Sequence, residues 1–172
     1  MKATSMKIGF GYATYEKLLN QLLQGLRDAF GEDVILSFAL FGSVARGEAR
    51  PDSDIDVLIV HKPVDFDPVW RFVKLLSGFR ESDEHRRLEA EGFSPDPYPV
   101  FMTEEEMYER PLILLDIMDH GIIIYDNGVL RKRFESLKKR LAELGTKKVV
   151  LEDGSWYWHL KPDWKPGEVI EL

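Results

Sequence analysis

The sequence predicts an α/β (α+β) protein, in which a small mixed β-sheet carries helices mainly on one face and a C-terminal helix and hairpin follow. Apolar residues recur at helical spacing over residues 14–30, the pattern of an amphipathic helix. Two apolar runs, residues 34–41 and 55–60, flank a turn-rich connection over residues 42–53 and are typical of buried strands. Alternating apolar residues around Asp153-Gly154 indicate a terminal hairpin.

The other elements follow from the same patterns. Thr103 and Glu106 form a T-x-x-E capping box, which predicts the start of a helix, and Pro111 predicts a kink within it. In chain order, the further expected elements are a helix over 69–76 with an exposed, charged continuation over 84–91, a strand over 100–102, a helix over 103–119, a strand over 122–125, a helix over 129–144, and hairpin strands over 148–151 and 156–160. We expect a domain over residues 1–126 and an extension over residues 127–172 that packs on the same domain.

Composition excludes several classes of protein. The chain has 172 residues and no cysteine, so disulfides, thiolate metal sites and cysteine nucleophiles are excluded. Residues 1–7 lack the features of a signal peptide, and no apolar run approaches the ~20 residues needed to cross a bilayer. We therefore expect a soluble, cytoplasmic protein with no membrane partner.

Charge is unevenly distributed along the chain. The net charge is −7, but residues 131–148 carry eight Lys or Arg against Glu135 and Glu143, which gives +6 there and −13 elsewhere. A chain this acidic is a poor general binder of nucleic acid. The basic helix over residues 131–140 is interpreted first as a solvated face and second as a surface for RNA, DNA or an acidic protein.

Two carboxylates stand out in the second strand. Asp54 and Asp56 are two residues apart, so both point to one face of the strand, with backbones roughly 6–7 Å apart. Anions held so close repel each other, and one takes up a proton unless a cation intervenes. Oxygen ligands of this kind suit Mg²⁺, which binds one or two carboxylates together with substrate phosphates.

The turn before this strand supplies groups for an anion. Gly42 follows a buried strand and lets backbone N–H groups approach phosphate oxygens, because no Cβ is in the way. The Ser43 hydroxyl can donate to the same group, and Arg46 can offset phosphate charge. A Gly-Ser dipeptide or a D-x-D pair alone is more often a plain turn or a solvated strand edge. The two together, ten residues apart, favour a phosphoryl-transfer site.

The stretch LFGSVARGEARPDSDIDVLIV resembles the signature of the DNA polymerase β-like nucleotidyltransferase superfamily, especially the minimal nucleotidyltransferases of prokaryotes. The resemblance is close over residues 40–60 and looser as far as Asp126, where HGIIIYD resembles the end of that minimal domain. It implies the polymerase β-like fold, Asp54 and Asp56 as catalytic metal ligands for Mg²⁺ or Mn²⁺, and Gly42, Ser43 and Arg46 as ligands of a nucleoside triphosphate, with ATP preferred.

The sequence departs from that signature at the third acid, which the superfamily places on the next strand as a general base. That strand contains no acid. If Val100 takes the expected position, Asp96 lies on the same face but roughly 13 Å back along the strand. Asp96 is retained as a candidate base. The alternatives are another residue, ionisation of the acceptor on the metal alone, or loss of activity.

Two functions are therefore compared. The first is transfer of a nucleoside monophosphate from Mg–NTP to a hydroxyl, with release of pyrophosphate and with RNA as one acceptor for the basic helix. The second is a non-catalytic nucleotide-binding or antitoxin-like module that binds an RNase toxin of the HEPN type, since minimal nucleotidyltransferases are often encoded beside such toxins. A homodimer is compatible with both.

Overall fold

The computed structural model describes residues 10–172, so residues 1–7, which were examined for a signal peptide, lie outside its description. The chain divides into two compact units, Met1–Leu130 and Arg131–Leu172. The expected boundary at residue 126 falls shortly before this division. In residues 10–172, no helix is long and apolar enough to cross a membrane.

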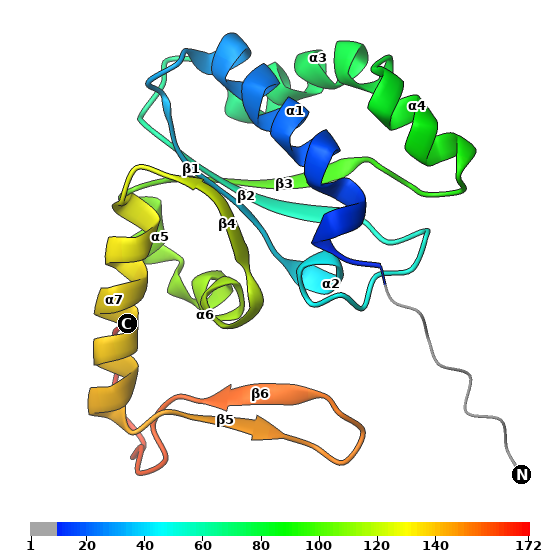
Figure 1. Cartoon of the computed structure of the whole chain (residues 1–172). Helices are drawn as coiled ribbons and strands as arrows, with labels where there is room; N and C mark the ends of the chain where they lie inside the picture. The colour runs from blue at the N-terminus through cyan, green and yellow to red at the C-terminus, as the bar shows by residue number, and fades with distance from the viewer. Residues whose placement is uncertain (1–9) are drawn as a thin grey trace, which may run out of the picture. The chain divides into compact units, whose positions relative to one another are not determined.

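The first unit is built on a four-stranded mixed sheet in the order β3-β2-β1-β4 (Figure 1). Its strands are β1 (Ile35–Leu40), β2 (Ile55–His61), β3 (Pro97–Thr103) and β4 (Ile122–Asp126). β1 runs antiparallel to both β2 and β4, whereas β2 and β3 are parallel. β3 is an edge strand, which is why it accommodates two prolines that cannot donate to a ladder.

Three helices cover one face of the sheet: α1 (Tyr12–Phe30), α3 (Pro68–Arg80) and α4 (Asp83–Ala90) (Figure 1). α1 is amphipathic, and its apolar stripe is buried against the odd-numbered residues of β2, which include Ile55 and Val57. Burial of such side chains stabilises the unit by about 1.5–3 kcal/mol each. The expected main layer of helices is therefore present.

The opposite face carries the helices α5 (Glu106–Glu109) and α6 (Pro111–His120) (Figure 1). Leu58 and Val60 of β2 are fully buried, and so are Leu114 and Leu115 of α6. β2 is thus buried on both faces along most of its length. Asp54 and Asp56 lie at the start of this strand, where Asp54 is exposed and Asp56 is half-buried.

Three expected boundaries differ from the structure for local reasons. Residues 84–91 do not continue the preceding helix, because Ser82 caps a separate helix by accepting a hydrogen bond from the backbone N–H of His85. The expected helix over residues 103–119 is divided at Arg110, and Pro111 begins α6 rather than kinking a longer helix. β3 is longer than residues 100–102. The capping box is present, with reciprocal bonds between Thr103 and Glu106.

The second unit contains most of α7 (Val129–Leu144) and a hairpin of β5 (Lys147–Val150) and β6 (Trp156–His159). Arg133 and Arg140 of α7 donate to the backbone carbonyls of Leu172 and Glu171, which fixes the end of the chain against this helix. The helix that carries the basic residues and the C-terminal hairpin are therefore both present, as the sequence predicts.

Candidate active site

The site is organised by the start of β2. Asp54 is exposed immediately before this strand, and Asp56 is half-buried as its second residue. Ile55 and Val57 are fully buried in the core under α1, so the alternation of the strand turns the two aspartates away from that core. The backbone carbonyl of Asp56 accepts a hydrogen bond of 2.9 Å from the N–H of Phe41, which ties the aspartate to the end of β1.

Gly42 lies directly against the Asp56 carboxylate. It has a φ of 70°, in the left-handed region that favours glycine, and a Cβ added to it would overlap the Asp56 Oδ2 atom. Gly42 begins α2 (Gly42–Ala45), a single turn that is anchored by the fully buried Val44. The glycine therefore has two functions here: it allows the turn, and it leaves space beside the carboxylate.

Ser43 and Arg46 belong to the same turn, as the sequence predicts. Ser43 is half-buried in α2, and its carbonyl accepts the N–H of Glu48 at 2.9 Å. Arg46 follows α2; its Nε donates to the Glu48 carboxylate at 2.9 Å, and its side chain is 26% exposed. The turn thus brings a glycine and a guanidinium to the side of β2 that carries the aspartates, and Ser43 lies between them in sequence.

The electrostatics of the site raise the pKa of the Asp56 carboxyl above its ordinary value. The largest cause is burial, which disfavours the charged form, and the negative charge of Asp54 acts in the same direction. The Arg46 guanidinium opposes the increase, and the Asp116 carboxylate adds to it. Asp56 is therefore a half-buried carboxyl, and two of the three charged groups that act on its pKa are other carboxylates.

Asp116 is a further acid beside this candidate site, and the sequence analysis did not single it out. It lies on α6, and its Oδ2 is 3.9 Å from Nη1 of Arg46. Helix α6 packs against α2, which brings this carboxylate to the turn that contains Gly42. The one sequence signal is an acid inside an otherwise apolar stretch, LILLDIM, and that signal gives no information on which part of the fold faces it.

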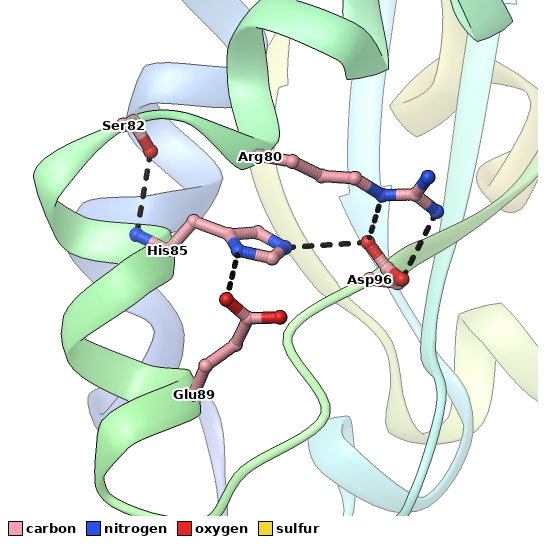
Figure 2. A network of polar contacts seen from close by, with 5 residues as sticks. All are labelled: Arg80, Ser82, His85, Glu89 and Asp96. Atoms are coloured by element: carbon pink, nitrogen blue, oxygen red, sulfur yellow. Dashed lines mark hydrogen bonds and ion pairs between the residues drawn. The ribbon is translucent and has the colours of Figure 1, made fainter.

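The backbone of Asp96 lies beside the start of β2, where its carbonyl accepts the N–H of Ile55 at 3.4 Å, but its side chain is engaged elsewhere. Its carboxylate accepts two hydrogen bonds from Arg80 of α3, at 2.9 and 3.0 Å, and its Oδ1 is 3.2 Å from Nε2 of the buried His85 (Figure 2). The Arg80 guanidinium and the His85 ring hold its pKa below the ordinary value. The register of β2 and β3 sets Tyr98, not Val100, opposite Asp56. Asp96 is thus engaged with α3 and α4, and its role as a base stays a prediction.

The donor set fits a hard divalent cation that also binds a phosphate-bearing substrate. Asp54 and Asp56 supply oxygen ligands, and the raised pKa of Asp56 shows that a cation beside it would relieve an unfavourable charge. Within residues 10–172, no group of three or more His, Asp or Glu side chains is placed to hold a metal ion. Mg²⁺ usually binds one or two protein carboxylates together with substrate phosphates, so a pair of carboxylates is sufficient.

Several known proteins are similar to this chain. The "Putative protein adenylyltransferase" of Methanocaldococcus jannaschii is 47% identical over 51 residues, which is 27% of this chain and 34% of that protein. The match therefore spans about a third of the relative's length. A crystal structure of a toxin–antitoxin with AMP-PNP is 17% identical, with 73% of this chain and 91% of that chain covered and a TM-score of 0.45. A "putative nucleotidyltransferase" from Sulfolobus solfataricus is 18% identical, with 66% and 88% covered and a TM-score of 0.33.

The family profile gives the assignment. The profile of the nucleotidyltransferase domain matches residues 19–149, which is more than half of the chain and includes both the Gly42 turn and the aspartates of β2. The resemblance that the motif indicates is thereby confirmed, and this chain belongs to the nucleotidyltransferase domain family.

Proposed function

We propose that the protein is a Mg²⁺-dependent nucleotidyltransferase that transfers a nucleoside monophosphate from a nucleoside triphosphate to a hydroxyl group and releases pyrophosphate. The observation that carries the proposal is the contact between Gly42 and Asp56, because it joins the phosphate-binding turn and the carboxylate pair in one site. A glycine is required there, and the space it leaves opens onto the carboxylate oxygen.

Each residue of the site has a part in the proposed reaction. Asp54 and Asp56 would hold Mg²⁺, which neutralises phosphate charge and stabilises the leaving oxygen when it is bound. The backbone at Gly42, the Ser43 hydroxyl and the Arg46 guanidinium bind the triphosphate oxygens and orient the α-phosphorus. The oxygen of the acceptor hydroxyl then forms a bond to the α-phosphorus, the bond from that phosphorus to the bridging oxygen breaks, and pyrophosphate leaves.

The name of one relative and the net charge of the chain favour ATP as the nucleotide donor and a protein as the acceptor. The Methanocaldococcus jannaschii relative bears the name protein adenylyltransferase, which supports ATP as the donor and a protein hydroxyl as the acceptor. The net charge of −7 agrees with that choice over a nucleic acid, since non-specific affinity for nucleic acid depends on phosphate attraction.

Calorimetric titration with Mg²⁺ and the α,β-methylene analogue of ATP tests binding at this site. The wild type is expected to bind, and the double variant Asp54→Ala/Asp56→Ala is expected to lose binding. Asp65→Ala is the matched control, because Asp65 belongs to a D-x-D pair outside the candidate site and is exposed. Failure of the wild type to bind any of the four Mg–NTPs would rule out the proposal.

A second candidate function is a non-catalytic module that binds nucleotide and neutralises a partner RNase. One observation favours it: Tyr98, not an acid, stands opposite Asp56 on β3. Under this alternative, the wild type binds Mg–ATP, produces no pyrophosphate with any acceptor, and is recovered in a stable complex with the partner. Pyrophosphate release that depends on Asp54 and Asp56 would exclude it.

A further inference from the structure

The two carboxylate oxygens of Asp116 have different surroundings. Oδ2 is 3.9 Å from Nη1 of Arg46. Oδ1 is buried and has no hydrogen-bond partner among the residues that the structure describes. A buried carboxylate oxygen without a donor is costly, so native structures usually supply a partner for it. The open oxygen therefore indicates a donor that arrives with a ligand.

The position of Asp116 is fixed by the core and is accessible. Leu114, Leu115 and Ile117, its neighbours on α6, are almost completely buried, so the helix cannot rotate without disrupting that core. The Asp116 side chain is 30% exposed although its Oδ1 atom is covered, and rotation about the Cβ–Cγ bond can present either oxygen to a ligand from solvent. A carboxylate on a rigid element that remains accessible meets the requirement for a catalytic group.

The other charged groups of the site already have parts in the proposed reaction. Asp54 and Asp56 are assigned to the metal, and Arg46 is assigned to the phosphates. The acceptor hydroxyl also has to lose its proton when it attacks, and proton transfer to a positioned side chain is the usual means. Asp116 is the charged group beside Arg46 that has an unfilled acceptor oxygen.

We propose that Asp116 is the general base of this site, and that one of its carboxylate oxygens accepts the proton of the attacking hydroxyl while the other faces Arg46. The inference rests on the proposed function. In the step, the hydroxyl oxygen bonds to the α-phosphorus, its proton moves to the Asp116 carboxylate, and the electron pair of the broken bond leaves with pyrophosphate. The proton passes to solvent when the product departs.

The geometry favours Asp116 over Asp96 for this role. Both oxygens of Asp96 already accept hydrogen bonds from Arg80, and one also contacts His85 (Figure 2). A carboxylate held in this way is a weak base, because its partners stabilise the charged form. Asp116 has an oxygen available, and Asp96 does not.

The experiment measures binding and transfer separately on the full chain. Transfer is followed with ATP labelled on its α-phosphate and four acceptors: water, total tRNA, casein and the protein itself. Asp116→Asn is expected to bind Mg²⁺ and the methylene analogue within about threefold of the wild type but to transfer label about 100-fold more slowly, the usual effect of losing a general base. Asp119→Asn, on the same helix, is the matched control and should resemble the wild type.

Chemical rescue separates a base from a structural role. In Asp116→Ala, molar formate should restore a substantial part of the transfer rate, because a small carboxylate can occupy the space and accept the proton. Transfer by Asp116→Asn at more than a third of the wild-type rate, or equal losses of binding and transfer, would overturn the inference and leave the proposed function intact. Loss of transfer in Asp96→Asn alone would assign the base to Asp96. A wild type that binds Mg–ATP but transfers label to none of the acceptors would overturn both.

Discussion

Two partly or fully buried carboxylates of this unit, Glu84 and Asp56, have pKa values that are shifted in opposite directions. Beside α4, Glu84 is 3% exposed and is bound by Lys17 at 2.9 Å and by Arg87 at 2.6 Å. Those cations lower the pKa of Glu84 from 4.5 to about 2. Beside α2, burial and the charge of Asp54 raise the pKa of Asp56, and Arg46 compensates only in part.

This difference in pKa distinguishes a carboxylate that stabilises the fold from one that belongs to the candidate active site. A paired carboxylate stabilises the fold at neutral pH, and its partners hold α1 and α4 together. A crowded carboxylate destabilises the fold until a ligand supplies the missing positive charge. Perturbed pKa values occur in both kinds of site, and here the direction of the perturbation distinguishes a stabilising ion pair from a candidate active site.

The largest expected effect comes from the contact between the turn and the carboxylate. Gly42→Ala places a methyl group where the Asp56 carboxylate now lies, so we expect Mg–nucleotide affinity to fall by about 100-fold as the carboxylate is displaced. The left-handed backbone adds a cost in stability of about 1–2 kcal/mol. Calorimetry with the methylene analogue and thermal unfolding measure the two effects.

Gly47 provides a matched control for this variant. It has the same φ of 70°, but a Cβ there would meet no atom within 4 Å. Gly47→Ala should therefore lose the same stability and keep its affinity for the nucleotide. Equal losses of affinity in the two variants would show that backbone strain, not contact with Asp56, controls the site.

A second test removes the charge of the buried Glu84 on the other side of the unit. Glu84→Gln keeps the shape of the side chain but loses its charge, and we expect the free energy of unfolding at pH 7 to fall by about 2 kcal/mol. Because its pKa is lowered on folding, Glu84 stabilises the protein above pH 4.5, and that contribution is lost as pH falls towards 2. The gap between variant and wild type should therefore close in acid.

Denaturant titrations at several pH values measure this gap, and the affinity for Mg–nucleotide should be unchanged at neutral pH. A reduced affinity in Glu84→Gln would contradict the separation of the two regions. A gap that stays constant down to pH 2 would show that packing, not charge, accounts for the loss.

Sequence patterns predict the fold and the centre of the site because both depend on short-range order. A buried strand, a glycine turn and a second strand with alternate aspartates lie within residues 34–60, so their spacing in sequence is close to their spacing in the fold. The same holds for the capping box at Thr103. Each of these features is determined by residues that are close together in the sequence.

The remaining features depend on tertiary structure. The approach of Asp116 to Arg46 depends on how α6 packs against α2, although 70 positions separate the two residues in sequence. The position of Tyr98 opposite Asp56 depends on the register of two parallel strands, which no turn joins directly. The pairing of Asp96 with Arg80 likewise depends on where α3 ends above the sheet. Sequence spacing does not contain this information.

The smallest expected effect is a gain in stability. Folding raises the pKa of Asp56, so the folded state binds more protons than the unfolded state, and stability contributed by its protonated form is lost as pH rises through the folded-state pKa. At pH 7 without metal, Asp56→Asn should therefore unfold about 1–3 °C higher than the wild type. The gain should disappear as pH falls and the wild-type carboxyl becomes protonated.

Magnesium and a control carboxylate sharpen this test. Mg²⁺ with the methylene analogue should raise the midpoint of the wild type and leave that of Asp56→Asn unchanged, since ligand binding stabilises only a chain that can bind. Asp52→Asn is the control, because Asp52 is 78% exposed and faces Arg50 at 3.5 Å, so its removal should give no gain. A midpoint for Asp56→Asn below that of the wild type without metal would mean that the carboxylate stabilises the fold. In that case the crowding of charge at the start of β2 would no longer argue for a bound cation.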